Sequence, residues 1–365
     1  MVIGVCVLAL LPAAVGHLPR ARNPLSAAEL LQRIQHSKGT AYSGYAESAG
    51  TLALPVTTGV GSLADLLGQR TTMRVWWRSA TDWRVDQVAP FGEVDTHRTG
   101  AGLATWNYEG NRVEYDEAGV AGAMRMPVAA DLLPPELGRR LLSEARDGEV
   151  VRRPVRRVAN VDAPGLRLSG GPASSIEHVD VYADPATGLP LEVDVYGRNA
   201  PGVAAVSTSF LDLSVAMPAA ATTSFEAPAG AAESDGASSD SLSTSLRFGF
   251  ARVPTSLAGL PSNARGGGAG VGIYGRGVTQ LVAVPLGWES TWRFSDQLTN
   301  AGSIAHTACS VAAVCAGRGG TRQEATVGPL SVLLLHDPDG HGWALTGTVV
   351  PATLRTAANE LLAWA

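Results

Sequence analysis

The sequence predicts an α+β fold that is mainly β and divided into two domains, and three observations lead to this prediction. The chain of 365 residues is longer than one ordinary hydrophobic core accommodates. Beyond residue 40, apolar and polar side chains alternate with a period of two, which is typical of antiparallel strands with one buried face. Residues Met217–Thr244 hold few large apolar side chains and separate two halves with strand and helix patterns.

Composition excludes some classes of function. Apolar residues make up 45% of the chain and charged residues 17%, which suits a globular protein and not a disordered one. The net charge of −5 gives no basic footprint of the kind that nucleic-acid binding requires, so we expect no nucleic-acid partner.

The N-terminus predicts export. Val2–Leu11 is an apolar run about as long as the core of a signal peptide, and Ala14–Gly16 resembles a signal-peptidase site. We expect residues 1–25 to be a signal or anchor segment, which places the protein outside the cytoplasm, either secreted or held at the membrane. The alternative is a buried N-terminal helix in a cytosolic protein.

Two helices are expected in the first domain. Ser26 and Glu29 form a capping box ahead of Leu30, Leu31 and Ile34, which share one face at helical spacing. A second helical stretch covers Asp131–Ala145, and its leucines recur at the same spacing after Pro134 and Pro135.

The strands of the first domain are expected as an antiparallel meander. Alternation is clearest in Thr72–Arg78, Asp82–Gln87 and Leu103–Tyr108, and continues through Val113 and Tyr115. After the second helix, strands are expected at Val155–Ala159, Ile176–Tyr182, Leu189–Val195 and Ala205–Leu213. We therefore assign residues 26–216 to the first domain and 217–244 to a flexible linker.

The second domain is expected at residues 245–365. Strand patterns occur at Val278–Pro285, Leu330–Leu335 and Trp343–Val349, and a helix follows from Pro351. This combination predicts a smaller C-terminal α+β domain.

Several segments of the sequence resemble segments of a known protein family. Arg157–Asn160, Val179–Asp184, Thr187–Leu191, Ser209–Leu213 and Leu345–Leu354 look like segments of two-domain RseB/MucB-type sigma-factor regulatory proteins, which have the LolA-like fold. Asn160 stands where that family usually has glycine, and Gly266–Thr326 has no counterpart. The resemblance implies a half-open antiparallel β-barrel lidded by helices, followed by the smaller domain.

Two local motifs that resemble a dinucleotide site and a metal site are better interpreted as a loop and a turn. Gly270–Gly275 fits G-x-G-x-x-G, but a strand pattern follows it where a dinucleotide site needs a helix, so we expect a flexible loop. His336, Asp337, Asp339 and His341 crowd together around a type I turn sequence, which we favour over a metal site. We expect neither a metal nor a cofactor.

The sequence lacks the familiar catalytic signatures. The sequence contains neither a G-x-S-x-G elbow nor an H-E-x-x-H motif, and its histidines are scattered. Asp180 and Asp184 share a strand face, which we assign to an edge or to solvent and not to acid–base chemistry. The expectation is therefore a protein that is not an enzyme.

Cys309 and Cys315 are the only cysteines after the N-terminal segment. An even count in an exported protein predicts a disulfide between them, although bridging requires Ser310–Val314 to turn back. Two free thiols are the alternative.

The candidate ligand site is an apolar surface under the two predicted helices. Side chains at i and i+2 share one face of a strand, so the apolar set of each strand is expected to line a common surface. Trp77 and Trp83 are expected to stack across neighbouring strands. The predicted lining is Met73, Val75, Trp77, Trp83, Val85, Trp106, Tyr108, Val181, Val193 and Val195. If the helices pack fully against these residues, the same set is an ordinary core.

Two functional hypotheses follow from the resemblance. One is an exported envelope protein of RseB type, which senses a hydrophobic ligand (a lipid or acyl chain) and regulates the extracytoplasmic segment of a membrane anti-sigma factor. The other is a LolA-like carrier of lipids or lipoproteins without a signalling role.

Overall fold

The structure is a computed structural model. It describes residues 25–52, 66–89, 92–117, 127–235, 253–263, 271–300, 305–308, 321–336 and 342–364. The predicted signal or anchor segment, except for Leu25, and the predicted disulfide between Cys309 and Cys315 lie outside these residues. Within the described part of the chain, no helix is both long and apolar enough to cross a membrane.

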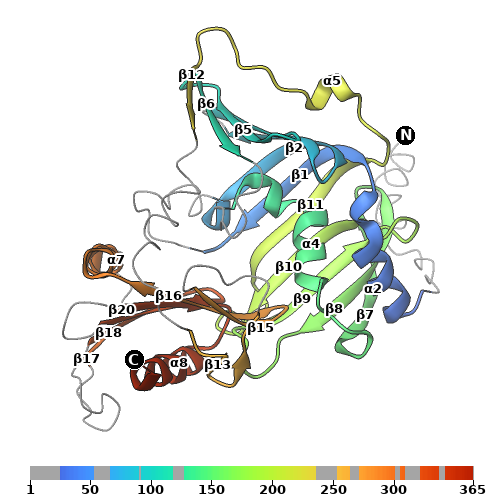
Figure 1. Ribbon diagram of the computed structural model, residues 1–365. Coiled ribbons are helices and arrows are strands. Elements are labelled where there is room, and N and C mark those ends of the chain that lie inside the picture. Colours follow the sequence, from blue (N-terminus) through green and yellow to red (C-terminus); the bar gives the residue numbers. More distant parts are fainter. Residues whose placement is uncertain are drawn as a thin grey trace, which may run out of the picture.

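The first domain is built on one large curved sheet with α-helices on its concave face (Figure 1). Twelve strands follow the order β12-β6-β5-β4-β3-β2-β1-β11-β10-β9-β8-β7, and all neighbours are antiparallel except β12 and β6. The strands are β1 (Tyr42–Gly50), β2 (Arg70–Ser79), β3 (Asp82–Ala89), β4 (Gly92–Arg98), β5 (Gly102–Asn107), β6 (Arg112–Glu117), β7 (Val150–Val158), β8 (Val161–Ser169), β9 (Ile176–Ala183), β10 (Pro190–Gly197), β11 (Ala204–Ser214) and β12 (Ala232–Asp235). The predicted meander and the α+β class are confirmed.

Both predicted helices are present, and their starts follow the sequence signals. Helix α2 (Ala27–His36) begins with the capping box, in which the Glu29 amide donates to Ser26 Oγ at 3.2 Å and the Ser26 amide donates to Glu29 Oε2 at 2.8 Å. Helix α4 (Pro134–Leu142) begins at Pro134 and follows the short 3-10 turn Ala129–Leu132. Figure 1 shows α2 and α4 lying across the strands β7–β10.

The turn between β7 and β8 shows why glycine is dispensable at residue 160. Ala159 and Asn160 both have positive φ, at 43° and 64°, and Val158 pairs with Val161. This is the conformation of a two-residue hairpin turn, and asparagine tolerates it better than most residues with a side chain. Asn160 therefore fits this turn in place of glycine.

The segment after β11 differs from the flexible linker expected for residues 217–244. Its described part, residues 217–235, packs on the outer face of the large sheet and is called the strap below. It contains α5 (Ala220–Thr223) and β12, which pairs with β6. Phe225 lies 4.8 Å from the ring of His97 and 6.4 Å from that of Tyr115, and His97 Nδ1 is 3.2 Å from the Thr223 carbonyl. One aromatic anchor and backbone pairing thus fix a segment that composition alone assigns to a linker.

The second domain is a six-stranded antiparallel sheet of order β15-β16-β20-β19-β18-β17, with a helix on each face (Figure 1). Its core contains Leu333 and Leu345 of the sheet together with Leu361 of α8. Its elements are β13 (Ser256–Leu257), β14 (Leu260–Pro261), β15 (Gly272–Arg276), β16 (Thr279–Leu286), α7 (Trp288–Asn300), β17 (Ala305–Ala308), β18 (Thr321–Val327), β19 (Leu330–His336), β20 (Gly342–Gly347) and α8 (Pro351–Trp364). The predicted smaller α+β domain is confirmed.

The glycine-rich motif forms part of a strand, and His336 ends another. Gly272 and Gly275 of the glycine-rich motif lie in strand β15 of a hairpin and not in a flexible loop, while Gly270 lies outside the described residues. His336 ends β19 opposite Gly342 of β20, and residues 337–341 lie outside the described part.

Candidate functional site

Eight of the ten predicted lining residues face the concave side of the large sheet. Cross-strand pairs place Val75 opposite Val85, Trp77 opposite Trp83, and Val181 opposite Val193, and paired residues share one face. They fall into two separate apolar clusters. The first contains Met73, Val75, Trp77, Trp83 and Val85, and the second contains Val181, Val193 and Val195 beside α2 residues.

Trp106 and Tyr108 are not part of this surface. The β4–β5 register sets Trp106 opposite Asp95, on the outer face, and sets Leu103 opposite Arg98 on the concave face. Leu103 belongs to the concave core, whereas Tyr108 is 61% exposed and contacts Trp106 edge to face at 5.3 Å. The prediction for these two residues is wrong because β5 carries apolar side chains on both faces, so parity alone could not decide which set points inward.

An aromatic stack forms the centre of the concave surface. The Trp77 and Trp83 rings are parallel, with centroids 5.4 Å apart, so the predicted stacking is confirmed. Tyr42 extends the stack on the other side of Trp77 at 5.9 Å, and Phe210 meets Tyr42 edge to face. Sequence reasoning missed Tyr42, because β1 reads YSGYAESAG and lacks an alternation of large apolar residues.

Polar atoms beside the stack are buried without hydrogen-bond partners among the described residues. They are the Trp77 indole Nε1, the Tyr42 hydroxyl and Arg139 Nη1 of helix α4. Burial raises the pKa of Tyr42 well above its usual range and lowers the pKa of Arg139. Such buried, unsatisfied groups cost free energy, so they mark a place where the packing is not optimised for stability alone.

Two cavities flank Trp77 on either side. One of about 240 Å³ is lined by apolar Trp83, Leu103 and Ala130 and by charged Arg98 and Asp131. The other, of about 370 Å³, is lined by Gln35, Lys38 and Arg139. Trp77, Ala80 and Glu136 line both. Volumes usual for small-molecule sites begin at about 300 Å³, so the first cavity is smaller than this and the second is only slightly larger. Their combined volume falls inside the usual range.

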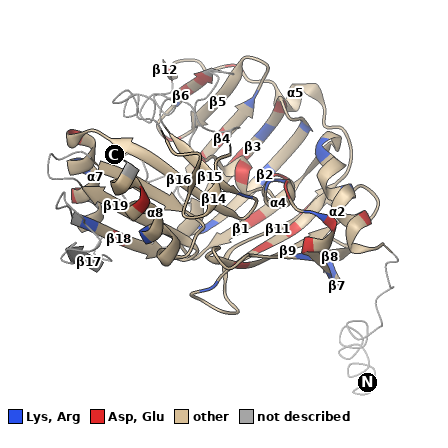
Figure 2. Ribbon diagram, turned by 60° about the horizontal axis from the view of Figure 1, so that its bottom comes forward, with Lys and Arg blue, Asp and Glu red and all other residues tan. Residues whose placement is uncertain are grey.

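The outer face of the sheet carries ionic clusters, and acidic and basic residues are interspersed along its strands (Figure 2). In one cluster Arg84 donates to Asp86 at 2.5 and 2.9 Å and to Asp95 at 2.9 Å. Ligand atoms of Asp86, Glu93 and Asp95 lie within 4.8 Å of one another. Because the Arg84 guanidinium already neutralises two of these carboxylates, the cluster is explained as an arginine-centred ion network.

Asp95→Asn is expected to stabilise the protein at alkaline pH. Burial, and secondly the charge of Asp86, raise the pKa of Asp95 to about 7, above the value of about 3.9 for an unfolded chain. The folded state therefore favours the protonated form. The stability that this proton provides is full below about pH 4 and is lost as the pH rises to about 7. We expect a gain of about 1–2 kcal/mol in the free energy of unfolding at pH 8 and little change at pH 4.

Urea unfolding of wild type and variant at both pH values measures this difference. Asp162→Asn is the matched control, because Asp162 is exposed and pairs with the exposed Arg157. An equal effect of Asp95→Asn at the two pH values would show that the carboxyl titrates normally.

Comparisons with known proteins give similarities of fold only. No family model and no curated protein matches the chain. Among solved structures, the Pseudomonas aeruginosa MucA/MucB complex is 16% identical with a TM-score of 0.46, and the match covers 91% of this chain and 96% of that one. A crystal structure of MucB is 15% identical with a TM-score of 0.43, over 91% and 96% of the two chains.

A LolA-superfamily protein from Nitrosomonas europaea is also similar, at 10% identity and a TM-score of 0.23, over 55% of this chain and 98% of that one.

Proposed function

We propose that this protein is an exported envelope binding protein of RseB type, which takes up a lipid or acyl chain beneath helix α4 and regulates an anti-sigma factor. The observation that carries the ligand part is the aromatic stack of Tyr42, Trp77 and Trp83, with a cavity on each side of Trp77 and buried polar atoms that have no partner in the described part of the chain. In this proposal the protein acts by binding and not by catalysis.

The regulatory part of the proposal comes from the sequence resemblance to RseB/MucB-type regulators, together with the second domain that this layout includes. The extracytoplasmic location is supported by the apolar run Val2–Leu11 and the small residues at Ala14–Gly16. A LolA-like carrier would use the same concave surface without the anti-sigma partner.

Ligand uptake requires the concave surface to open. In the described form Met73, Val75 and Val85 are fully buried, and Trp77 is 4% exposed. Burying an acyl chain of 14 carbons contributes about 0.8 kcal/mol per CH₂, or roughly 11 kcal/mol, before the costs of association. Since part of this must offset the displacement of α4, we expect a dissociation constant in the micromolar range and not lower.

Titration with myristate, followed by tryptophan emission, tests the ligand part. We expect a saturable blue shift in the mature protein, because an acyl chain beside Trp77 replaces the remaining water. The shift should be weaker in Trp77→Phe and unchanged in Trp292→Phe, since Trp292 is 67% exposed on α7, in the other domain. No response up to about 100 µM myristate would leave the concave residues as an ordinary core.

Crosslinking in the native envelope then separates the two functions. Capture of a single-pass membrane protein whose cytoplasmic part holds a sigma factor supports the regulator. Release of bound lipid to a lipoprotein receptor, without such a partner, supports the carrier.

A further inference from the structure

The two domains meet through contacts of two kinds, which both line a cleft of about 500 Å³ and are joined by a hydrogen bond from the Ser174 hydroxyl to the Val278 carbonyl at 3.3 Å. On one side, the loop between β8 and β9 binds the segment between β20 and α8 by backbone hydrogen bonds. The Ser175 amide donates to the Thr348 carbonyl at 3.1 Å, and the Val350 amide donates to the Ala173 carbonyl at 2.9 Å. The Asn199 side chain adds a bond to the Gly328 carbonyl at 2.9 Å. These contacts anchor the second domain to strands of the large sheet.

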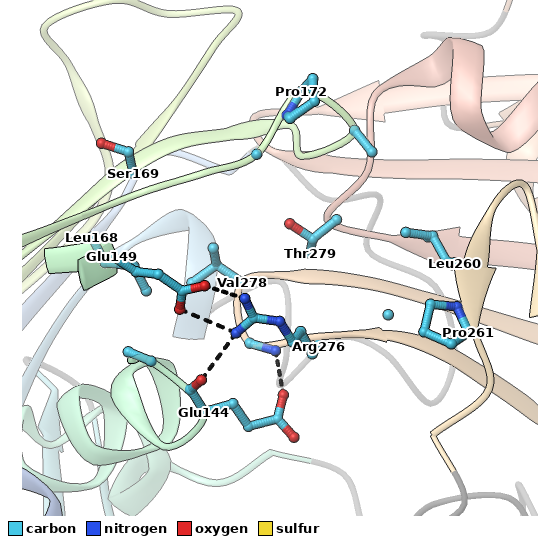
Figure 3. A pocket seen from close by; sticks show the side chains of 15 residues that line it. Glu144, Glu149, Leu168, Ser169, Pro172, Leu260, Pro261, Arg276, Val278 and Thr279 are labelled. Atoms are coloured by element: carbon cyan, nitrogen blue, oxygen red, sulfur yellow. Dashed lines mark hydrogen bonds and ion pairs between the residues drawn. The ribbon is translucent and has the colours of Figure 1, made fainter. Parts of the chain in front are cut away.

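On the other side, the turn between β15 and β16 contacts the residues that follow helix α4 (Figure 3). Arg276 Nη1 donates to the Glu144 carbonyl at 3.0 Å and to Glu149 Oε2 at 3.1 Å, and Nη2 donates to Glu149 Oε1. The Gly277 amide donates to the Glu144 carboxylate at 2.5 Å. The Arg276 hydrogen bonds hold the pKa of Glu149 below its usual range, so this contact is charged on both sides at neutral pH.

The same turn is also part of the first domain's core. Val278, two residues after Arg276, is buried in the apolar cluster that contains Val150, Leu168 and Val195. Helix α4 covers this core on the concave side of the sheet. Gly138 lies so close to β10 that a Cβ there would meet Pro190 Cβ at 2.9 Å and Val193 Cγ2 at 3.2 Å. The Gln35 side chain ties α2 to the end of α4 through the Leu142 and Ala145 carbonyls, at 2.8 and 3.1 Å.

We propose that the Arg276 contact with Glu144 and Glu149 is an interdomain latch, through which movement of helix α4 changes the position of the second domain. The backbone contacts at Ala173–Ser175 serve as the hinge, because they join the second domain to the sheet and not to the helix. Residues of both hinge and latch line the cleft. This inference rests on the proposed function only for its trigger, a ligand entering beneath α4.

Hydrogen exchange of the full chain tests the latch without any ligand. In Arg276→Ala we expect the amides of residues 134–145 to exchange roughly 2–5-fold faster, because partly exposed ion pairs contribute about a kilocalorie per mole or less. Arg293→Ala is the matched control, since Arg293 pairs with Glu289 on the exposed face of α7 in the same domain. The charge swap Glu149→Arg with Arg276→Glu should restore slow exchange.

Faster exchange confined to residues 272–280, with α4 unchanged in Arg276→Ala, would overturn the latch. If Arg276→Ala fails to fold, failure of the charge swap to recover both folding and α4 protection would also overturn it. A second arm adds myristate and measures the interdomain distance by spin labels. We expect a distance change in wild type that is lost in Arg276→Ala. If myristate does not bind, the proposed ligand fails while the exchange arm still decides the latch.

Discussion

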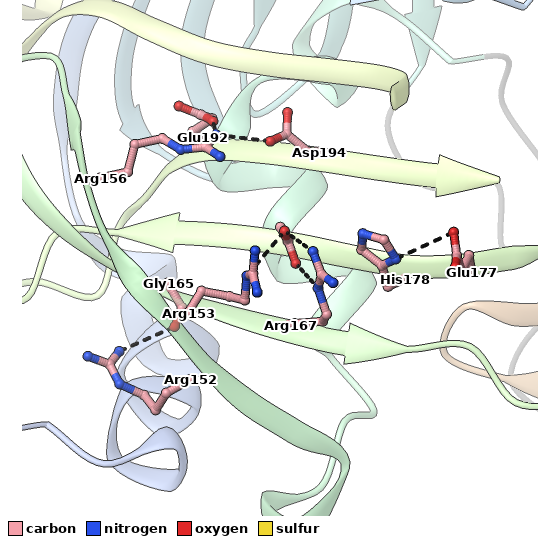
Figure 4. Close-up of polar contacts among 10 residues, drawn as sticks. Arg152, Arg153, Arg156, Gly165, Arg167, Glu177, His178, Glu192 and Asp194 are labelled. Atoms are coloured by element: carbon pink, nitrogen blue, oxygen red, sulfur yellow. Dashed lines mark hydrogen bonds and ion pairs between the residues drawn. The ribbon is translucent and has the colours of Figure 1, made fainter. Parts of the chain in front are cut away.

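Asp180→Ala is expected to lower the free energy of unfolding by about 3 kcal/mol, because it removes the carboxylate at the centre of a buried ion network. Asp180 lies on the outer face of β9 and is 2% exposed. It accepts two hydrogen bonds from Arg167, both at 2.6 Å, and lies 3.6 Å from Arg153 (Figure 4). Removing one partner of such a pair usually costs about 3–5 kcal/mol, and the partial exposure of both arginines places the expectation at the lower end.

The neighbouring strand completes the network and explains why the loss cannot be repaired locally. Arg156 is already engaged by Glu192 and Asp194, and its guanidinium lies 4.2 Å from the Tyr182 ring centroid. A carboxylate from β10 is therefore not free to replace Asp180. The Tyr182 ring covers Gly165, where a Cβ would meet it at 2.6 Å, so the packing on this face is tight as well.

Urea unfolding of Asp180→Ala and of the control Asp162→Ala measures the effect. Asp162 pairs with Arg157 at 3.1 Å on the exposed end of the same sheet, and its loss should cost less than about 0.5 kcal/mol. Similar losses in the two variants would mean that the buried network contributes no more than a surface ion pair.

Asp180 also shows how far residue patterns lead without a structure. Its strand was predicted, and the face that it shares with His178 and Tyr182 follows from parity. The edge or solvent position assigned to it is wrong, because β9 lies inside the sheet and Arg167 of β8 and Arg153 of β7 cover the Asp180 carboxylate on the outer face. A run such as Val151–Arg157 does not reveal whether its arginines point to solvent or to carboxylates on strands distant in sequence.

Strands were predictable where large apolar side chains alternate, as in β2, β3 and β9–β11. Strand β4 carries Glu93, Asp95 and His97 on its outer face and Val94, Thr96 and Arg98 on the other, so it has no apolar alternation. The period of two in the sequence was enough to place the eight concave residues on one face. The faces of Trp106 and Tyr108 could be decided only from the register between β4 and β5. The strap escaped prediction because it is held by Phe225 and by backbone pairing, which composition does not encode.

Trp77→Ala is expected to destabilise the protein by about 3–5 kcal/mol, the usual cost of removing a buried tryptophan. Trp77 is the middle ring of the Tyr42–Trp77–Trp83 stack, so the substitution removes two ring contacts as well as its buried area. It also removes the side chain that lies between the cavities of about 240 and 370 Å³. The variant should then contain one continuous space in the size range of small-molecule sites, lined by charged side chains such as Asp131, Glu136 and Arg139 as well as by apolar ones.

The response of this variant to a ligand separates the two interpretations of the concave surface. Apolar cavities created in protein cores bind apolar molecules, and a ligand that binds only the folded state raises its stability. We expect myristate to raise the melting temperature of both wild type and Trp77→Ala, with no change in the effect for the exposed control Trp292→Ala. Stabilisation of Trp77→Ala alone would mean that the substitution created the site and that the wild-type residues are a packed core. Stabilisation of wild type and loss of the effect in Trp77→Ala, with the fold intact by circular dichroism, would mean that the indole itself contacts the acyl chain.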